Sequence, residues 1–320
     1  MLPLSGPQMS NFPGGFSNGL MVRGLPVLNS YNGQVFWVDS NNGGDGNPGT
    51  YNRPLATIDR AFSLVASGRG DVVMVKPGHA ETISSAAILV PDVAGVAVVG
   101  LGQGSARPTL TFGTATTASI PVGAANIVFQ NFLFKANYAD IVAPFTIGAA
   151  KDFWLIGCEF RDNSSILNFK YLLDVGSTSN AADGLGMFGC RFLGSGTTSG
   201  TRCVNMAGTN DRFYFKDNRI RTKATSDAAL MAIATGKVVT SAEIERNDFD
   251  LVGASGTTTG ILITTDGSTT NSGLIADNTA QSLDATSEIL VTASSGFRFM
   301  RNYYSGATDK SGYLLPAADA

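Results

Sequence analysis

The chain has 320 residues, a formal net charge of −3 and only 15% charged side chains, against 43% hydrophobic ones. This length and apolar content allow a large core and exclude a disordered chain. The weak negative charge gives no drive towards nucleic acid, so we expect no nucleic-acid partner. No apolar run approaches 18 residues, and the N-terminus lacks a basic segment before an apolar one. We therefore expect neither a membrane span nor a signal peptide.

Cysteine and histidine are too few for several kinds of site. Three cysteines, an odd number, argue against a disulfide framework, and we expect Cys158 and Cys190 to be buried thiols. The single histidine, His79, makes a Ser-His-Asp site or a histidine-built metal centre improbable on numbers alone. We expect no metal and no cofactor.

The first segment, residues 1–34, is rich in Gly, Pro and Asn, which exclude a long helix. It is nevertheless too apolar for a free tail. We expect an extended N-terminal arm that lies on its own fold or on another protein. Four apolar residues are the candidates for anchoring it: Phe12, Phe16, Leu20 and Val22.

A loop and a helix follow. Residues 39–53, DSNNGGDGNPGTYNR, resemble a calcium loop but lack the closing Glu, so ion binding and a plain Asx/Gly turn both stay open. In residues 54–67 the apolar positions fall on one helical face and Pro54 stands at the start. This pattern predicts an amphipathic helix that caps the N-terminal end of the core. Its apolar face consists of Leu55, Ile58, Phe62 and Val65.

From residue 126 onwards the chain repeats. The quartet GCEF (157–160) returns as GCRF (189–192), and similar segments recur at intervals of roughly 28 residues. Taking the central residue of each as an origin gives Asn131, Cys158, Cys190, Asn218, Asn247, Asn278 and Asn302. The positions three before and two after each origin are almost all apolar, and Gly/Ser/Thr clusters separate the segments. This is strand and turn chemistry.

A coil of about 28 residues that stacks on its neighbours is a parallel β-helix. The step between the two inward positions is odd, so each coil must bend near its origin. Asn suits such a bend, and stacked asparagines would bond from coil to coil as a ladder. We therefore predict an all-β fold, a single-stranded parallel β-helix (solenoid), over residues 35–305, followed by a C-terminal tail, residues 306–320.

Residues 35–83 make the resemblance specific. An Asp-led loop, a P-x-x-T-I segment and a G-D-x-x-x-V-x-P-G strand occur in the order found in pectate-lyase-like right-handed β-helix proteins. The matching positions are Asp39, Pro54, Thr57, Ile58, Gly70, Asp71, Val75, Pro77 and Gly78. The resemblance implies the right-handed fold and says little about activity. More weakly, residues 11–29 resemble leaders of structural proteins in tailed-bacteriophage particles.

Strand parity predicts an outward apolar patch in the coils from 126 to 214. Such a patch is rarely left exposed to water, so we expect a subunit interface there. The alternative, a bulge that reverses parity and makes these residues core, stays open. The predicted interface residues are Ile127, Phe129, Trp154, Ile156, Phe188 and Tyr214.

Four carboxylates cluster in one coil and could serve glycoside hydrolysis, which needs two of them. They are Glu243, Glu245, Asp248 and Asp250. Lys216 and Arg219 stand at matching positions of the preceding coil, so we favour outer-surface ion pairs and expect no catalytic residue.

Taken together, these patterns favour a non-enzymatic virion structural protein that decorates or reinforces a phage capsid, assembled in the bacterial host cytoplasm. The resemblance implies a homotrimer, and the arm would bind the capsid or another virion protein. One alternative is a tailspike-like protein that binds or hydrolyses bacterial surface polysaccharide. A cell-surface or secreted adhesin is the third alternative, which the missing signal peptide disfavours.

Overall fold

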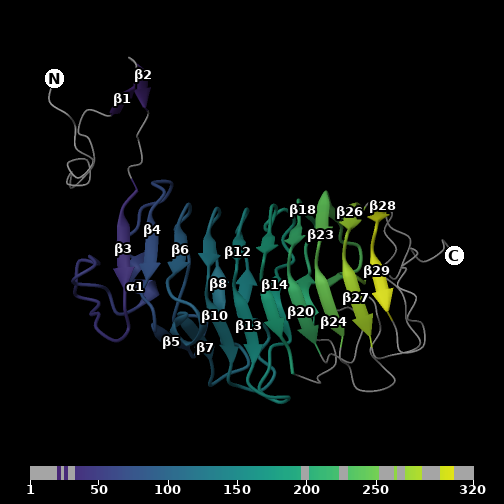
Figure 1. The fold of residues 1–320 in the computed structure, drawn as a ribbon, viewed down its shortest axis with the longest axis horizontal. Helices are drawn as coiled ribbons and strands as arrows, with labels where there is room; N and C mark the ends of the chain where they lie inside the picture. The colour runs from purple at the N-terminus through teal and green to yellow at the C-terminus, as the bar shows by residue number, and fades with distance from the viewer. Residues whose placement is uncertain are drawn as a thin grey trace.

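The computed structural model describes residues 20–22, 25–27, 33–195, 202–222, 230–251, 263–264, 271–282 and 296–305. Over these residues the strands form three parallel sheets whose coils stack along one axis, as predicted, in a right-handed parallel β-helix. Figure 1 shows the stack running from β3 (Val35–Val38) to β28 (Gly296–Met300). None of the described helices has the length and apolar character needed to cross a membrane.

A complete coil contributes one strand to each of the three main sheets, which have ten, nine and six strands over the described residues. The ten-stranded sheet contains β3, β4 (Val72–Val75), β6 (Ala97–Gly100), β9 (Val128–Gln130), β12 (Trp154–Ile156), β15 (Gly186–Phe188), β19 (Tyr214–Lys216), β23 (Ala242–Glu245), β26 (Ser272–Ala276) and β28. The nine-stranded sheet contains β5 (Ala80–Ile83), β7 (Thr109–Phe112), β10 (Leu133–Ala136), β13 (Glu159–Asp162), β16 (Arg191–Leu193), β20 (Arg219–Thr222), β24 (Asp248–Leu251), β27 (Thr279–Ser282) and β29 (Tyr303–Ser305). The six-stranded sheet contains β8 (Ile120–Val122), β11 (Phe145–Ile147), β14 (Tyr171–Val175), β17 (Arg202–Met206), β21 (Met231–Ile233) and β25 (Ile263–Thr264). A small pair, β18 (Asn210–Asp211) and β22 (Val239–Thr240), lies beside them.

Alternate residues of each strand fill the interior of the coil, and like residues stack from coil to coil. Phe134 and Phe160 are register partners, and their rings stack at 5.0 Å. Phe145 reaches in from the six-stranded sheet, 5.5 Å from Phe129. Each buried aromatic ring removes a large apolar area from water, so these rows supply much of the favourable free energy of folding.

The bend between the ten-stranded and nine-stranded sheets is a single residue in the left-handed conformation. This residue supplies the odd step that the sequence pattern requires. Its φ lies between 48° and 62° at Asn131, Gly157, Gly189, Asp217, Arg246, Asp277 and Arg301.

The residue after this bend carries the predicted asparagine ladder. Asn218, Asn247, Asn278 and Asn302 are buried, and each amide nitrogen donates to the side-chain oxygen of the next, at 3.0, 2.9 and 2.9 Å. The same oxygens accept the backbone N–H of the preceding coil, and each amide nitrogen also donates to a carbonyl of that coil. The ladder thus pairs polar backbone groups that the bend would otherwise leave buried without partners.

Two cysteines continue this column. Cys158 and Cys190 are buried, as predicted, and each thiol lies 3.4 Å from the carbonyl oxygen that an asparagine would contact, that of Phe129 or Leu155. A thiol is a weak donor, so these coils have a weaker version of the same contact.

The predicted ladder is wrong at its first member. Val128 pairs with Trp154, which places Phe132, not Asn131, beside Cys158. Asn131 instead occupies the left-handed bend with φ 62°, and its amide donates to the Gly100 carbonyl at 2.8 Å. Asn tolerates this conformation better than most residues, so the same residue type can stand at either of two adjacent positions.

The N-terminal cap contains a shorter helix than predicted. Instead of residues 54–67, the helix α1 covers only Ile58–Phe62, with Thr57 as N-cap accepting the Arg60 N–H at 3.2 Å. The helix cannot begin at Pro54, because Leu55 is extended and forms a β-bridge with β3. The predicted apolar face is confirmed, since Leu55, Ile58, Phe62 and Val65 are all buried.

Asp71, in the strand motif that carries the family resemblance, connects this cap to the first coils. Its buried carboxylate accepts from the Arg69 guanidinium at 2.6 Å and from the backbone N–H groups of Gln34 and Ala66 at 2.7 and 2.8 Å. Burial raises the pKa of Asp71, but these hydrogen bonds outweigh burial and lower it below 3.8.

We predict that Asn247→Ala destabilises the fold, because it leaves ladder partners in two neighbouring coils unpaired in a buried position. The expected loss in the free energy of unfolding is about 3 kcal/mol. Urea denaturation measures it. Asn163→Ala, at an exposed asparagine with a single side-chain partner, is the control and should change stability by under about 0.5 kcal/mol. Equal effects of the two changes would contradict a ladder that stabilises the bend.

We also predict that Asp71→Asn costs about 3 kcal/mol at pH 7, because Arg69 loses its buried partner. The native pKa of Asp71 lies below the unfolded value of 3.8, so its contribution is present above that pH and is lost as the pH falls through the native pKa. The stability difference between wild type and variant should therefore shrink below about pH 4. Denaturation curves from pH 7 to pH 2 test this, with the exposed Asp92→Asn as the control. A difference that stays constant over this range would contradict the prediction.

Candidate functional site

The six predicted interface residues divide into two groups. Ile127 and Phe129 are fully buried, so the prediction that they face outwards is wrong. The one-residue displacement at Asn131 reverses the parity of the whole strand, and Val128 and Gln130 take the outward places. The other four lie on the outer face of the ten-stranded sheet with partly exposed side chains: Trp154, Ile156, Phe188 and Tyr214.

Trp154, Phe188 and Tyr214 form an aromatic row across three successive strands, β12, β15 and β19. The Trp154 and Phe188 rings meet edge to face at 5.6 Å, and the Phe188 and Tyr214 rings stack at 6.2 Å. The indole N–H of Trp154 donates to the Gly184 carbonyl at 2.9 Å, which fixes the ring orientation.

Gly186 makes the row continuous. It is the register partner of both Trp154 and Tyr214, and it has no side chain in the column that these two rings occupy. The Phe188 ring lies over it instead: a Cβ on Gly186 would be 2.4 Å from the Phe188 ring and 3.0 Å from Trp154. An alanine there would have to displace Phe188.

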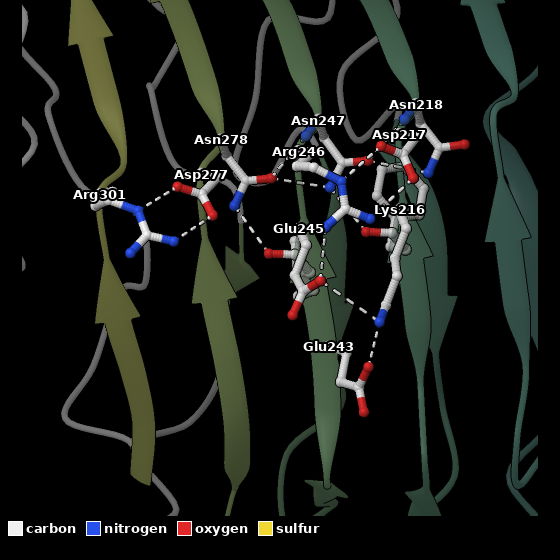
Figure 2. Close-up of polar contacts among 12 residues, drawn as sticks. Lys216, Asp217, Asn218, Glu243, Glu245, Arg246, Asn247, Asp277, Asn278 and Arg301 are labelled. Carbon is white, nitrogen blue, oxygen red and sulfur yellow. Dashed lines mark hydrogen bonds and ion pairs between the residues drawn. The ribbon is translucent and has the colours of Figure 1, made fainter.

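A charged cluster, Lys216, Glu243 and Glu245, follows the row on the same face. Glu243 is the register partner of Tyr214, and Glu245 is that of Lys216. The Lys216 ammonium contacts the Glu243 carboxylate, lies 3.5 Å from that of Glu245, and sits 5.8 Å from the centre of the Tyr214 ring (Figure 2 shows the ion pairs). One cation thus lies between two carboxylates, at the end of an aromatic surface.

Ion pairing raises the pKa of the lysine in this cluster. Burial alone would lower the pKa of Lys216. The hydrogen bond and charge of Glu243 and the charge of Glu245 together outweigh burial, so the pKa of Lys216 is raised. The two carboxylates differ in surroundings. Glu243 is 43% exposed, while Glu245 is 18% exposed and has a second cation, Arg246, at 3.0 Å.

A groove of about 730 Å³ opens beside this cluster and is lined by residues of the adjacent strands β23, β26 and β28. Its walls combine the two carboxylates with an arginine, two hydroxyls and several apolar groups. The lining residues include Glu243, Glu245, Ser241, Ser272, Leu274, Arg298 and Met300. Carboxylates, hydroxyls and a guanidinium offer many hydrogen bonds to a ligand rich in hydroxyl groups.

The four carboxylates predicted as a possible site are not together. Asp248 and Asp250 lie beyond the bend, on β24 of the nine-stranded sheet, where they pair with Arg219 at 3.4 Å and Arg221 at 3.6 Å. These are cross-coil ion pairs of the kind the sequence favours. Only Glu243 and Glu245 reach the groove.

The bend itself carries a second charge pattern, which Figure 2 shows beside the asparagine ladder. Asp217 pairs with Arg246 at 2.8 and 3.0 Å, and Asp277 pairs with Arg301 at 2.6 and 2.7 Å. The hydrogen bond with Arg246 is the main cause that lowers the pKa of Asp217. These paired groups connect coils and present no free acid or base.

The loop at residues 39–53 uses its carboxylates internally. Asp39 accepts the backbone N–H groups of Asn41 and Asn42, and Asp45 accepts those of Ala56 and Thr57. The contacts of Asp39 have Asx-turn geometry, whereas those of Asp45 connect the loop to the start of α1. Within the described ranges, no group of three or more His, Cys, Asp or Glu side chains could hold a metal ion.

The anchoring residues of the predicted arm are only partly described. Phe12 and Phe16 lie outside the described residues. Leu20 and Val22 are the ends of β1 (Leu20–Val22), which pairs antiparallel with β2 (Leu25–Val27), so this part of the predicted extended arm is a short hairpin.

No protein-family model and no curated protein matches the sequence, whereas solved structures do. A rhamnogalacturonan lyase matches with a TM-score of 0.43 and 13% identity, covering 88% of this chain and 90% of that one. The GH136 lacto-N-biosidase from Eubacterium ramulus matches with a TM-score of 0.41 and 12% identity, covering 85% and 68%. The pectate lyase Pel9A matches with a TM-score of 0.41 and 13% identity, covering 89% and 82%. The three sheets of the described residues form a parallel β-helix, as predicted, and the likeness to these structures is one of fold alone.

These structures also correct one expectation. All three are enzymes by name, whereas the sequence predicts a non-enzymatic protein. That prediction is withdrawn on this finding, and the chemistry of the chain has to be argued from its own groove.

The sequence prediction did not include two residues of the candidate site. Gly186 looks like a gap in an aromatic column, and only the position of the Phe188 ring shows that the gap is filled. Arg298 stands in the same outward column as Trp154 and Glu243, and the structure shows that it lines the groove. A search for unlike residues within one outward column would have found both.

Proposed function

We propose that the chain binds a saccharide in the groove beside β23 and hydrolyses it, as a tailspike-like protein that acts on bacterial surface polysaccharide. The observation that carries the proposal is the pair Glu243 and Glu245, which lines a groove of about 730 Å³ together with Arg298. Two carboxylates beside a hydroxyl-binding groove are what glycoside hydrolysis requires.

The spacing of the pair suits this chemistry. Residues two apart on a strand have their Cα atoms about 6.6 Å apart and point to the same side. Both carboxylates approach the Lys216 ammonium, so their oxygens lie closer together than this backbone spacing alone would require. Carboxylates roughly 5–10 Å apart can act on opposite sides of one glycosidic bond.

The surroundings assign the two roles. Glu245 lies 3.5 Å from Lys216 and 3.0 Å from Arg246, and we assign it the role of base or nucleophile at the anomeric carbon. Glu243 is more exposed and pairs with Lys216, and we assign it the role of the acid that donates a proton to the leaving oxygen. The glycosidic C–O bond breaks, and water supplies a hydroxyl to the sugar and a proton to the leaving group.

The proposal keeps the chain in a tailed-phage particle, as a spike. The support is the resemblance of residues 11–29 to leaders of particle proteins, together with the compatibility of a spike with a surface polysaccharide. The homotrimer, the attachment through residues 1–34 and the location in the virion belong to the same proposal. Sedimentation of the purified protein measures the oligomeric state.

The activity is tested on purified bacterial capsular polysaccharides and lipopolysaccharides, by new reducing ends and product masses. Hydrolysis should add one water per cut. Glu243→Gln and Glu245→Gln should each lower the rate at least about 100-fold. Asp250→Asn, in the same coil but on the other sheet, is the matched control and should leave the rate unchanged. Cutting that survives both glutamine variants would overturn the assignment, as would the absence of cutting across the panel.

A further inference from the structure

We infer that the aromatic row, Trp154, Phe188 and Tyr214, is the binding track along which an extended polysaccharide reaches the groove. The substrate of the proposed activity would then be a polymer that occupies several coils, and a short oligosaccharide would bind poorly. This inference rests on the proposed function.

The row supplies one ring per coil. Successive coils are about 4.8 Å apart, which is close to the length of one hexose unit in an extended chain. The C–H groups of a sugar face carry a small positive charge and pack on the negative face of an aromatic ring. Three rings on β12, β15 and β19 can therefore hold successive sugars of one chain in a line.

The row leads directly to the proposed site. Tyr214 is the register partner of Glu243, and the Lys216 ammonium lies 5.8 Å from its ring centre. A chain lying on the three rings would next meet Glu243 and the groove behind it. The hydrogen bond from Trp154 to Gly184 and the packing of Phe188 over Gly186 hold two of the rings before any ligand arrives, so little conformational entropy is lost on binding.

A second copy of the chain fits this face less well. Outward apolar residues also occupy the neighbouring strands of this face, among them Val128 and Ile156, and the apolar surface ends at the charged cluster that begins with Lys216. A flat subunit interface covering the row would also cover Lys216, Glu243 and Glu245, and removing such charges from water is costly. A thin, hydroxyl-rich chain leaves these groups hydrated or hydrogen-bonded.

The sequence has two tryptophans, Trp37 and Trp154. The test uses the full chain with Trp37→Phe, so that all tryptophan fluorescence comes from Trp154. Its fluorescence is titrated with the capsular polysaccharides and lipopolysaccharides, and with short fragments of each. We expect at least one polymer to change the emission and to bind about ten-fold more tightly than its fragments. Fragments that bind as tightly as the polymer would overturn the inference.

Two variants probe the row itself. Gly186→Ala keeps every ring but forces Phe188 off its position, and Tyr214→Ala removes a ring. Each should weaken polymer binding about ten-fold while the thermal unfolding midpoint stays near that of wild type. Tyr138→Ala, at a ring that is 39% exposed on a loop away from the row, is the matched control and should bind as wild type does. Unchanged binding in both row variants would overturn the track.

Further outcomes separate this inference from the proposed function. Glu243→Gln should abolish cutting and retain binding, so a polymer that binds Trp154 but is never cut would refute hydrolysis while supporting the track. Trp154 emission that no panel member changes would refute the track, whatever the cutting assay gives. Oligomers that Trp154→Asp dissociates would assign the row to a subunit interface and overturn the inference.

Discussion

The one-residue bend between the ten-stranded and nine-stranded sheets is the constraint on which the rest of the molecule depends. A parallel coil must turn sharply there without leaving buried N–H and C=O groups unpaired. The left-handed residue makes the turn, and the asparagine that follows it pairs backbone groups of the coils on either side. Each amide uses both its donors and its acceptor, so the ladder also fixes the height of one coil against the next.

The left-handed conformation at the bend costs free energy, and ion pairs at some of the bends offset a part of this cost. A non-glycine residue in the left-handed conformation costs about 1–2 kcal/mol, least for Asn and Asp. Gly157 and Gly189 avoid this cost, whereas Arg246 does not. The two-point ion pair from Arg246 to Asp217 contributes only a modest compensation because both groups are exposed. The ion pairs at these bends therefore contribute more to aligning one coil with the next than to the free energy of unfolding.

The sequence is sufficient to predict the stacking of coils, the buried faces and most of the ladder, because these follow from residue type at a repeating interval. It fails where one residue type suits two adjacent positions. Asn131 fits the bend as well as it would fit the ladder, and a shift of one residue exchanged the inner and outer faces of β9. The helix was predicted too long because its periodicity does not reveal that Leu55 pairs with β3. The charged column of Lys216 and Glu245 was visible in the sequence, but the groove beside it was not, because it depends on how the outward side chains of three neighbouring strands lie.

Register also connects the scaffold to the proposed chemistry. The aromatic row and the charged cluster use the same outward parity of consecutive strands. The contacts at the bend, from Cys158 and Cys190 to Asn218 and Asn247, therefore run beside the strands that carry Trp154 to Glu243. A rigid array of this kind binds a long ligand with little ordering of its own side chains. Gly186 shows how closely the surface depends on this geometry: the missing side chain in one coil is what lets the ring of Phe188 align with the rings of its neighbours. The outer face is thus set by the same coil-to-coil contacts that stabilise the core.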